Sequence, residues 1–447
     1  MNEKGNRIVP LAAAFLAGVV VAAIAAFVLI RQQSSALQQQ SQADQAAETV
    51  QQAEQEPGAS QQAEQEPGAS QQAGPAEQGS DQPEGGSDAS DSDAGGDIDY
   101  AEVFPSWDPD SASLKELVDF VKDSTDEASR GYIEPADRIA VFDMDGTILC
   151  EKAPIYIDNC LTMYRVLDDP TYNATEEERD AMQQVRDRAY TNGEIFNPEG
   201  INKDVLVSTA FAGMTPEEFR DYVVDFADSV NAVGFDGMTY GQSFYKPMIE
   251  VIDYLRANDF DVWMVSACER EVVRALIDRY DIQYDHVIAT DVPYVASGKG
   301  DEAADEYNMS SEEEILLGTP LDEVECGRSG KPAAIAREIG KRPVLAFGNS
   351  AGDYSMLNYA EGNPDHTGMG FFVVCDDTVR EYGSEKKAAD YMIEVEKNGW
   401  TPFSMADDWV TIYGEGVVKT ELPGAKEAES ETEEELPETE EALPDAA

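Results

Sequence analysis

Five short apolar segments separated by helical patterns constrain the fold of this 447-residue chain more than any other feature. The segments are IAVF (139–142), VWMV (262–265), HVIAT (286–290), VLAFG (344–348) and FFVVC (371–375). Continuous apolar runs of this length are typical of strands that are buried on both faces. The helical patterns that separate them are PMIEVIDYLRAN (247–258), REVVRALIDRY (270–280) and KPAAIAREIG (331–340). This alternation predicts a parallel sheet covered by helices on both sides.

A long insertion separates the first two predicted strands. Residues 150–260 carry mostly helical patterns, with clear helix starts in the segments 174–190 and 214–230. An insertion of this length in a strand-to-helix loop is expected to form a subdomain over the site. We therefore predict an α/β fold class: a Rossmann-like parallel sheet of about five strands with helices on both faces, plus a helical cap inserted after the first strand.

The N-terminus carries a candidate membrane anchor. Residues 8–30 are 23 uncharged, mostly apolar residues, which is enough to cross a hydrocarbon core of about 30 Å as a helix. Lys4 and Arg7 precede this segment and Arg31 follows it, so the balance of two basic residues against one slightly favours an N-terminus inside and the rest of the chain outside. The alternative is a cleaved signal peptide, in which case the protein is secreted. We expect residues 1–31 to form the anchor and the protein to be extracytoplasmic, at the cell surface or in the periplasm.

Two segments have the composition of disordered chain. Residues 32–99 are rich in Gln, Glu, Ser, Gly and Pro and contain the decamer QQAEQEPGAS twice, at 51–60 and 61–70. Such a composition cannot bury a core and predicts a disordered acidic linker. The acidic, Pro-containing residues 421–447 are expected to form a disordered tail. The remaining segments, 100–149 and 261–420, are then the catalytic core.

The charge of the chain limits its partners. The formal net charge is −59, and residues 115–420 alone hold 61 acidic against 27 basic residues. A surface this acidic argues against binding of nucleic acid, whose phosphates require Lys and Arg. It also repels anionic substrates, so a phosphate site would need local positive charge.

Zinc and thiol chemistry are not expected. The chain has two histidines and five widely spaced cysteines, none of them in a C-x-x-C pair. This pattern disfavours a zinc site or a Cys/His nucleophile, and it indicates buried small residues rather than a disulfide framework.

Polar side chains follow the ends of several predicted strands. The parallel sheet brings the carboxyl ends of its strands to one edge, where ligands bind in folds of this kind. The candidate site residues there are Asp143, Asp145, Ser266, Lys331, Asn349 and Asp353. Together they offer carboxylates, a hydroxyl, a cation and oxygen ligands for a hard divalent metal such as Mg²⁺.

These segments resemble the haloacid dehalogenase-like superfamily, and specifically its phosphoserine-phosphatase-like branch. The resemblance covers about residues 138–359 and rests on DMDGT (143–147), VSACER (265–270), GRSGKP (327–332) and GNSAGDYSML (348–357), in the family's order. It implies that Asp143 attacks phosphorus to form an aspartyl phosphate and that Asp145 acts as acid and then as base. It also implies that Ser266 and Lys331 hold the phosphoryl group.

The resemblance further implies a magnesium ion bound by the Asp143 carboxylate, the Asp145 main-chain carbonyl and the acid of the fourth motif. That motif departs from the family pattern, since Asn349 stands where an Asp is usual and Asp353 is its only acid. Either Asn349 or Asp353 is then the direct ligand. Lys152 stands where phosphoserine phosphatases carry a substrate-binding Glu, with Glu151 one residue earlier, so the substrate is left open.

We expect an Mg²⁺-dependent phosphomonoester hydrolase that acts on a small phosphorylated metabolite outside the cytoplasm. The alternatives are a phosphotransferase or mutase on the same scaffold, and a non-catalytic surface-binding protein. Arg270 and Arg328 lie near the motifs, where contact with phosphate is one explanation and a surface charge is the one we favour. For Cys268 we favour a packed small residue over a reactive thiol.

Overall fold

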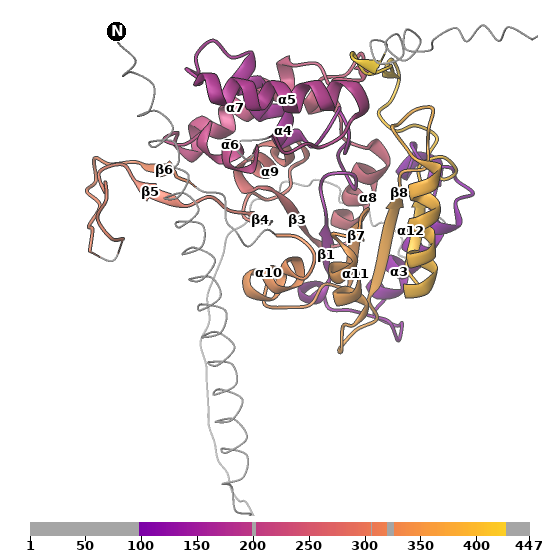
Figure 1. Ribbon diagram of the computed structural model, residues 1–447. Coiled ribbons are helices and arrows are strands. Elements are labelled where there is room, and N and C mark those ends of the chain that lie inside the picture. Colours follow the sequence, from indigo (N-terminus) through magenta and orange to yellow (C-terminus); the bar gives the residue numbers. More distant parts are fainter. Residues whose placement is uncertain (1–97, 199–202, 305, 320–325, 426–447) are drawn as a thin grey trace, which may run out of the picture. The chain divides into compact units, whose positions relative to one another are not determined.

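The computed structural model describes residues 98–198, 203–304, 306–319 and 326–425 (Figure 1). The predicted anchor, the linker and almost all of the acidic tail lie outside these ranges. Among the residues described, no helix has both the length and the hydropathy needed to cross a membrane.

A six-stranded parallel sheet forms the centre of the fold, with strand order β4-β3-β1-β7-β8-β9 (Figure 1). Its strands are β1 (Ile139–Phe142), β3 (Asp261–Glu269), β4 (Val287–Thr290), β7 (Leu345–Gly348), β8 (Met369–Val374) and β9 (Thr401–Ser404). The predicted parallel α/β sheet is therefore confirmed, with one strand more than expected. The additional strand, β9, contains Pro402, which cannot donate to a ladder and is tolerated because β9 lies at the sheet edge.

Both faces of the sheet are buried, as the continuous apolar runs predict. Ile139 and Val141 of β1 belong to one apolar cluster, whereas Ala140 and Phe142 belong to the other. Successive side chains of a strand point to opposite faces, so every residue of such a strand must be apolar. Phe142 stacks on Phe347 of the neighbouring β7 with ring centroids 4.1 Å apart, which fixes these two strands against each other.

Helices cover each face. The helices that contribute to the cluster around Val141 are α10 (Gly330–Glu338), α11 (Tyr354–Glu361) and α12 (Glu385–Asn398). Those that contribute to the cluster around Phe142 are α3 (Ala112–Thr125), α8 (Lys246–Ala257) and α9 (Arg270–Ile277). The short helix α2 (Tyr100–Val103) precedes α3.

Four helices lie between β1 and α8 in the sequence, and they make up most of the predicted cap (Figure 1). They are α4 (Ile157–Leu167), α5 (Glu176–Asn192), α6 (Lys203–Thr209) and α7 (Pro216–Ser229). Helix α7 begins as its sequence predicts, because Thr215 and Glu218 form a reciprocal capping box. Apolar side chains of α4, α5 and α7 belong to the same cluster as Phe142, on one face of the sheet. The division of the chain into core, cap, linker and tail stays a prediction.

Two small antiparallel sheets complete the described residues. One pairs β2 (Phe235–Asp236) with β10 (Val418–Lys419), and the other pairs β5 (Tyr294–Ala296) with β6 (Ile315–Leu317). The β5–β6 hairpin binds the loop before α7, since Gly213 N donates to Leu317 O and Leu317 N donates to Met214 O. The chain between β4 and α10 is thereby tied to the α4–α7 segment.

Candidate active site

The loop after β1 holds two carboxylates in a tight, hydrogen-bonded turn. Asp143 still belongs to the sheet through its N–H, which donates to Phe347 O at 2.9 Å. The chain then winds around the carbonyl of Met144, which accepts from the N–H groups of three of the following residues. Gly146 closes this turn with φ of +82°, a conformation that favours glycine. The carboxylates of Asp143 and Asp145 are thus presented from a rigid backbone.

Lys331 joins two of these motifs through its side chain. Its ammonium donates to Oδ1 of Asp143 at 2.6 Å and to Oδ1 of Asp353 at 2.7 Å, and the residue is only 1% exposed. Burial alone would lower the pKa of Lys331, but the two carboxylates raise it above its ordinary value. Lys331 is therefore a fixed positive charge. It supplies the local cation that the acidic surface of the chain makes necessary for any phosphate site.

Asp353 uses both carboxylate oxygens within the protein. Oδ1 accepts from Lys331, while Oδ2 accepts from the N–H groups of Asn349 and Ser350 at 3.1 and 3.0 Å. The Ser350 hydroxyl donates to the same oxygen at 3.1 Å. The carboxylate therefore orders the loop that carries Asn349 and holds the ammonium of Lys331 in place.

The side-chain amide of Asn349 lies beside two oxygen atoms of the Asp143 loop. One end of the amide is 3.3 Å from Asp143 Oδ2 and 3.1 Å from the main-chain oxygen of Asp145, and an NH₂ group at that end donates to both. With the amide oxygen at that end, three oxygen atoms from two motifs face one another. In an octahedron with Mg–O distances near 2.1 Å, adjacent oxygens are separated by about 3.0 Å. One carboxylate and two neutral carbonyl oxygens therefore fit one face of a magnesium coordination sphere, with the remaining positions left for water or substrate. No group of three or more His, Cys, Asp or Glu side chains is placed to hold a metal ion among the described residues.

The charge state of the two aspartates differs from that of free carboxylates. Burial raises the pKa of Asp143, the Asp353 carboxylate adds to the rise, and Lys331 opposes it. Burial also raises the pKa of Asp145 well above its usual range, with further contributions from Asp158 and Asp143. Oδ1 of Asp145 is buried without a hydrogen-bond partner. Burial of this kind favours the protonated form of a carboxyl group.

Ser266 lies on the neighbouring strand but does not contact the other candidates. Pairing of Phe142 with Met264 brings Ser266 to the same end of the sheet as Asp143. Its hydroxyl oxygen accepts from Cys268 N at 3.1 Å, at a point where the register between β3 and β4 shifts. The structure therefore brings together Asp143, Asp145, Lys331, Asn349 and Asp353, and leaves Ser266 in a local backbone contact.

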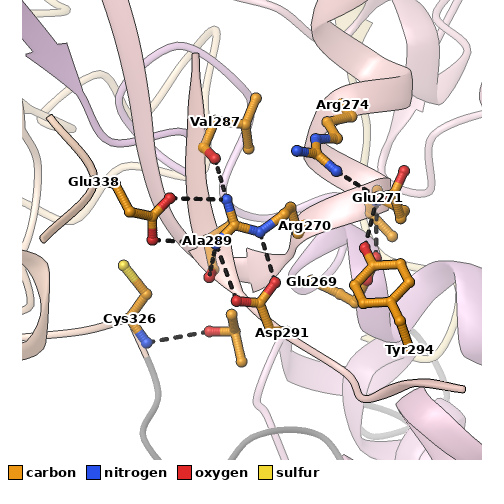
Figure 2. Close-up of polar contacts among 12 residues, drawn as sticks. Glu269, Arg270, Glu271, Arg274, Val287, Ala289, Asp291, Tyr294, Cys326 and Glu338 are labelled. Atoms are coloured by element: carbon orange, nitrogen blue, oxygen red, sulfur yellow. Dashed lines mark hydrogen bonds and ion pairs between the residues drawn. The ribbon is translucent and has the colours of Figure 1, made fainter. Parts of the chain in front are cut away.

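Arg270 is a buried structural residue, neither a surface charge nor a phosphate ligand (Figure 2). Its guanidinium pairs with Asp291 at 2.6 and 3.0 Å and with Glu338 of α10, and it also donates to the carbonyls of Val287 and Ala289. Motif position suggested a role for this residue, but all of these contacts are with the protein itself. It ties the start of α9 to the end of β4 and to the helix that carries Lys331.

The five cysteines are unpaired, and four of them are buried. The expectation that the cysteines are buried small residues is thereby confirmed for four of the five. Burial raises the pKa of the Cys268 thiol well above its usual range, which keeps it protonated.

Sequence reasoning missed several groups near Asp145. Thr147 is fully buried, and its hydroxyl lies 3.3 Å from Asp143 Oδ2. The Tyr156 hydroxyl donates to Glu151 at 3.3 Å, and both residues follow the Asp143 loop directly. Their position next to the first motif was the only available signal. Glu151 and Asp158 give Asp145 an acidic surrounding.

Comparison with known proteins gives one family match. Residues 140–358 match the model of the haloacid dehalogenase-like hydrolase family, which covers the segment from β1 to α11. No curated protein matches the sequence.

Several solved structures are similar. A functionally unknown protein from Anaerococcus prevotii is 16% identical, with a TM-score of 0.42, over 68% of this chain and 95% of that one. A cytosolic 5′-nucleotidase IIIB bound to cytidine is 12% identical, with a TM-score of 0.36, over 63% and 83% of the two chains. A phosphoserine phosphohydrolase-like protein from Francisella tularensis is 12% identical, with a TM-score of 0.32, over 57% and 92%. These similarities are too low to transfer a substrate.

Proposed function

Since residues 140–358 belong to the haloacid dehalogenase-like hydrolase family, we propose that the chain is a phosphomonoester hydrolase acting through an aspartyl phosphate. The observation that carries this proposal is the contact of 2.6 Å between the buried carboxylate of Asp143 and the ammonium of Lys331. A carboxylate and a phosphate repel each other, so an attack requires positive charge at the point of contact. Lys331 supplies one such charge.

Asp143 would form a bond to phosphorus as the bond from phosphorus to the leaving oxygen breaks. Asp145 would give its proton to that oxygen, so that an alcohol leaves. It would then take a proton from water as the water attacks phosphorus, which releases phosphate and restores the Asp143 carboxylate. The raised pKa of Asp145 suits the first of these roles. Ser266 stays our candidate for a hydrogen bond to a phosphoryl oxygen.

Magnesium would be held by the Asp143 carboxylate, the Asp145 carbonyl and the Asn349 amide oxygen, and there it would offset the negative charge of nucleophile and phosphate. Asn349 is favoured over Asp353 as the direct ligand, because both oxygens of Asp353 accept hydrogen bonds from the protein. Asp353 would act by positioning Lys331 and the Asn349 loop.

We further propose that the substrate is a small phosphorylated metabolite that is met outside the cytoplasm. The basis for the location is the apolar segment 8–30 and its basic N-terminal flank. The α4–α7 segment would serve as the cap that selects the alcohol part of the substrate and excludes water.

The test is hydrolysis of p-nitrophenyl phosphate by the full-length chain with and without MgCl2. The wild type is expected to release p-nitrophenol only when magnesium is present, and Asp143→Asn is expected to lose at least about 10³-fold in turnover. Asp137→Asn is the matched control, because Asp137 pairs with Lys341 at 2.8 Å and lies just before β1, at the opposite end of that strand from Asp143. Equal turnover by wild type and Asp143→Asn would refute the nucleophile assignment.

A further inference from the structure

One end of the Asn349 side-chain amide faces two acceptor atoms, 3.3 Å from Asp143 Oδ2 and 3.1 Å from the Asp145 carbonyl oxygen. With the amide oxygen at this end, no proton lies between it and either acceptor, and the amide nitrogen faces only donors. Oxygen atoms at this separation repel one another unless a cation lies between them. This orientation therefore suits a protein with metal bound, and it is unfavourable without metal.

The opposite orientation of the same amide has the reverse property. With nitrogen and oxygen exchanged, the NH₂ group donates to Asp143 Oδ2 at 3.3 Å and to the Asp145 carbonyl at 3.1 Å. Two acceptors that would otherwise be left facing each other are then satisfied without a cation. This orientation closes the site in the absence of metal.

We propose that Asn349 is a two-position ligand, whose NH₂ group fills the cation site when metal is absent and whose carbonyl turns inward when magnesium binds. The proposal rests on the metal site of the proposed function, and it adds that the NH₂ group of Asn349 competes with magnesium for this site. Because the amide must give up its own hydrogen bonds before it can ligate, the apparent affinity for magnesium is reduced.

The surroundings permit an exchange of the two ends and little other movement. Asn349 is 6% exposed, and a Cβ atom on Gly146 would lie 1.8 Å from its nitrogen. The amide therefore packs directly against the backbone of the Asp143 loop. Rotation about its last side-chain bond exchanges nitrogen and oxygen without displacing either neighbour.

Thr147 can satisfy both orientations. Its hydroxyl lies 3.3 Å from Asp143 Oδ2 and 3.5 Å from the amide oxygen of Asn349. A hydroxyl carries one proton and also accepts. It can donate to the amide oxygen in one orientation, and it can donate to Asp143 Oδ2 in the other, in which both protons of the NH₂ group are used by Asp143 and Asp145.

An aspartate at position 349 would lack the closed position. A second carboxylate facing Asp143 at about this distance repels it unless a cation intervenes, and it offers no proton to the Asp145 carbonyl. With Asn at position 349, the amide can present either its NH₂ group or its oxygen to the site. We therefore expect the loop to stay ordered in both the metal-free and the metal-bound protein.

The experiment compares full-length wild type with Asn349→Asp, Asn349→Ala and Asn358→Asp. Asn358 lies on the exposed side of α11, so Asn358→Asp makes the same charge change away from the site. Thermal unfolding is followed after removal of metal with EDTA and again across a MgCl2 titration, and magnesium binding is measured by calorimetry. Neither readout depends on turnover.

Without metal, Asn349→Asp is expected to unfold at a lower temperature than the wild type. Its gain in melting temperature on addition of magnesium is expected to exceed that of the wild type, and its affinity for magnesium to be at least about tenfold tighter. Asn349→Ala is expected to gain less than the wild type, and Asn358→Asp to gain the same. If Asn349→Asp folds only when magnesium is added, while Asn349→Ala folds without it, the proposal is also supported.

Equal magnesium-induced gains in wild type and Asn349→Asp would overturn the proposal, as would the absence of magnesium binding by any of the proteins. Turnover of p-nitrophenyl phosphate by the same wild-type sample tests the proposed function separately. If the wild type is active and the magnesium-induced rise in melting temperature is equal in wild type and Asn349→Asp, the phosphatase proposal is supported and the two-position amide is refuted. If the wild type is inactive and the rises differ as expected, the two-position amide is supported and the phosphatase proposal is refuted.

Discussion

The ammonium of Lys331 lies 2.6 Å from Oδ1 of Asp143, although the two residues are 188 positions apart in the chain. Both are buried, and Lys331 contacts Asp353 as well. A buried ion pair of this kind contributes little net stability, but removal of one partner leaves an uncompensated charge. The pair therefore makes both the fold and the reaction dependent on the same side chain.

Replacement of Lys331 by Met is expected to reduce both stability and activity. Two buried carboxylates would lose their common partner, at a cost of about 3–5 kcal/mol in the free energy of unfolding. Turnover should fall by about 10²-fold or more, because the charge that faces the phosphoryl group is removed. Urea unfolding and p-nitrophenyl phosphate turnover measure the two effects.

Lys341→Met is the matched control for that substitution. Lys341 also pairs with an aspartate, Asp137, at 2.8 Å, but its side chain is 49% exposed. Exposed pairs contribute at most about 1 kcal/mol, so the control should lose little stability and keep full turnover. A Lys331→Met enzyme that turns over like this control would contradict the assigned role.

A second prediction separates backbone strain from crowding in the Asp143 loop. Gly146 and Gly213 have similar positive φ values, +82° and +87°, so alanine strains both. A Cβ atom at Gly213 meets nothing within 4 Å, whereas one at Gly146 would lie 1.8 Å from the Asn349 nitrogen. Gly213→Ala should cost roughly 1 kcal/mol and keep its response to magnesium. Gly146→Ala should lower the free energy of unfolding by more than Gly213→Ala does, and it should lose most of the magnesium-induced rise in melting temperature. An unchanged rise would show that the loop tolerates displacement of Asn349.

Much of the fold and part of the site follow from local sequence. The apolar runs mark five of the six parallel strands because a strand buried on both faces needs apolar residues at every position. Parallel pairing then brings the ends of β1, β3 and β7 to one edge, which is why Asp143 and Asn349 could be predicted to be neighbours. The strand β9 was not counted among the five, because its sequence TPFS is not a continuous apolar run.

Other features depend on side-chain contacts that spacing does not specify. Whether Asn349 or Asp353 faces a metal is decided by the hydrogen bonds of Asp353, and these exist only in the folded loop. The local contact of the Ser266 hydroxyl follows from an irregular register at the end of β3. Arg270 finds its partners at positions 291 and 338, far along the chain. Such pairings between distant charged residues leave no periodic trace in the sequence.

A third prediction concerns Glu269 and pH. Glu269 caps α9 through Oε2, which accepts from Val272 N at 2.9 Å, while Oε1 is buried without a partner. Burial raises the pKa of this carboxyl group to about 8 from its usual 4.5. The raised value means that the neutral acid is favoured in the folded state. Its contribution to stability is therefore fully present below about pH 4.5 and is lost as the pH rises through about 8.

Glu269→Gln keeps the cap and removes the charge, so it should escape this loss. Near pH 4.5 the variant and the wild type should differ little, and at pH 9 the variant should be more stable by roughly 2–5 kcal/mol. Urea unfolding at a series of pH values measures the difference, with the exposed Glu116→Gln on α3 as the baseline for a Glu-to-Gln exchange. A stability difference that stays constant from pH 4.5 to 9 would show that the pKa of Glu269 is the same in the folded and the unfolded protein.

The last prediction concerns Glu271, whose contacts with Arg274 and Tyr294 are drawn in Figure 2. Its carboxylate is fully buried and accepts at 2.7 Å from each of four donors. The donors are Arg220 of α7, Arg274 of α9, Tyr284 and Tyr294 of β5.

Glu271→Ala leaves two arginines and two hydroxyls without their acceptor, and should lower the free energy of unfolding by about 3–5 kcal/mol. Glu217→Ala is the control. It removes a carboxylate that pairs with Arg220 but is 73% exposed, and it should lower the free energy of unfolding by less than about 1 kcal/mol.

Proteolysis gives a second measurement. Because Glu271 connects α7 to α9, proteolysis of the α4–α7 segment in native protein should accelerate in Glu271→Ala and not in Glu217→Ala. Equal stability and equal proteolysis of the two variants would mean that Glu271 does not hold α7 against the sheet.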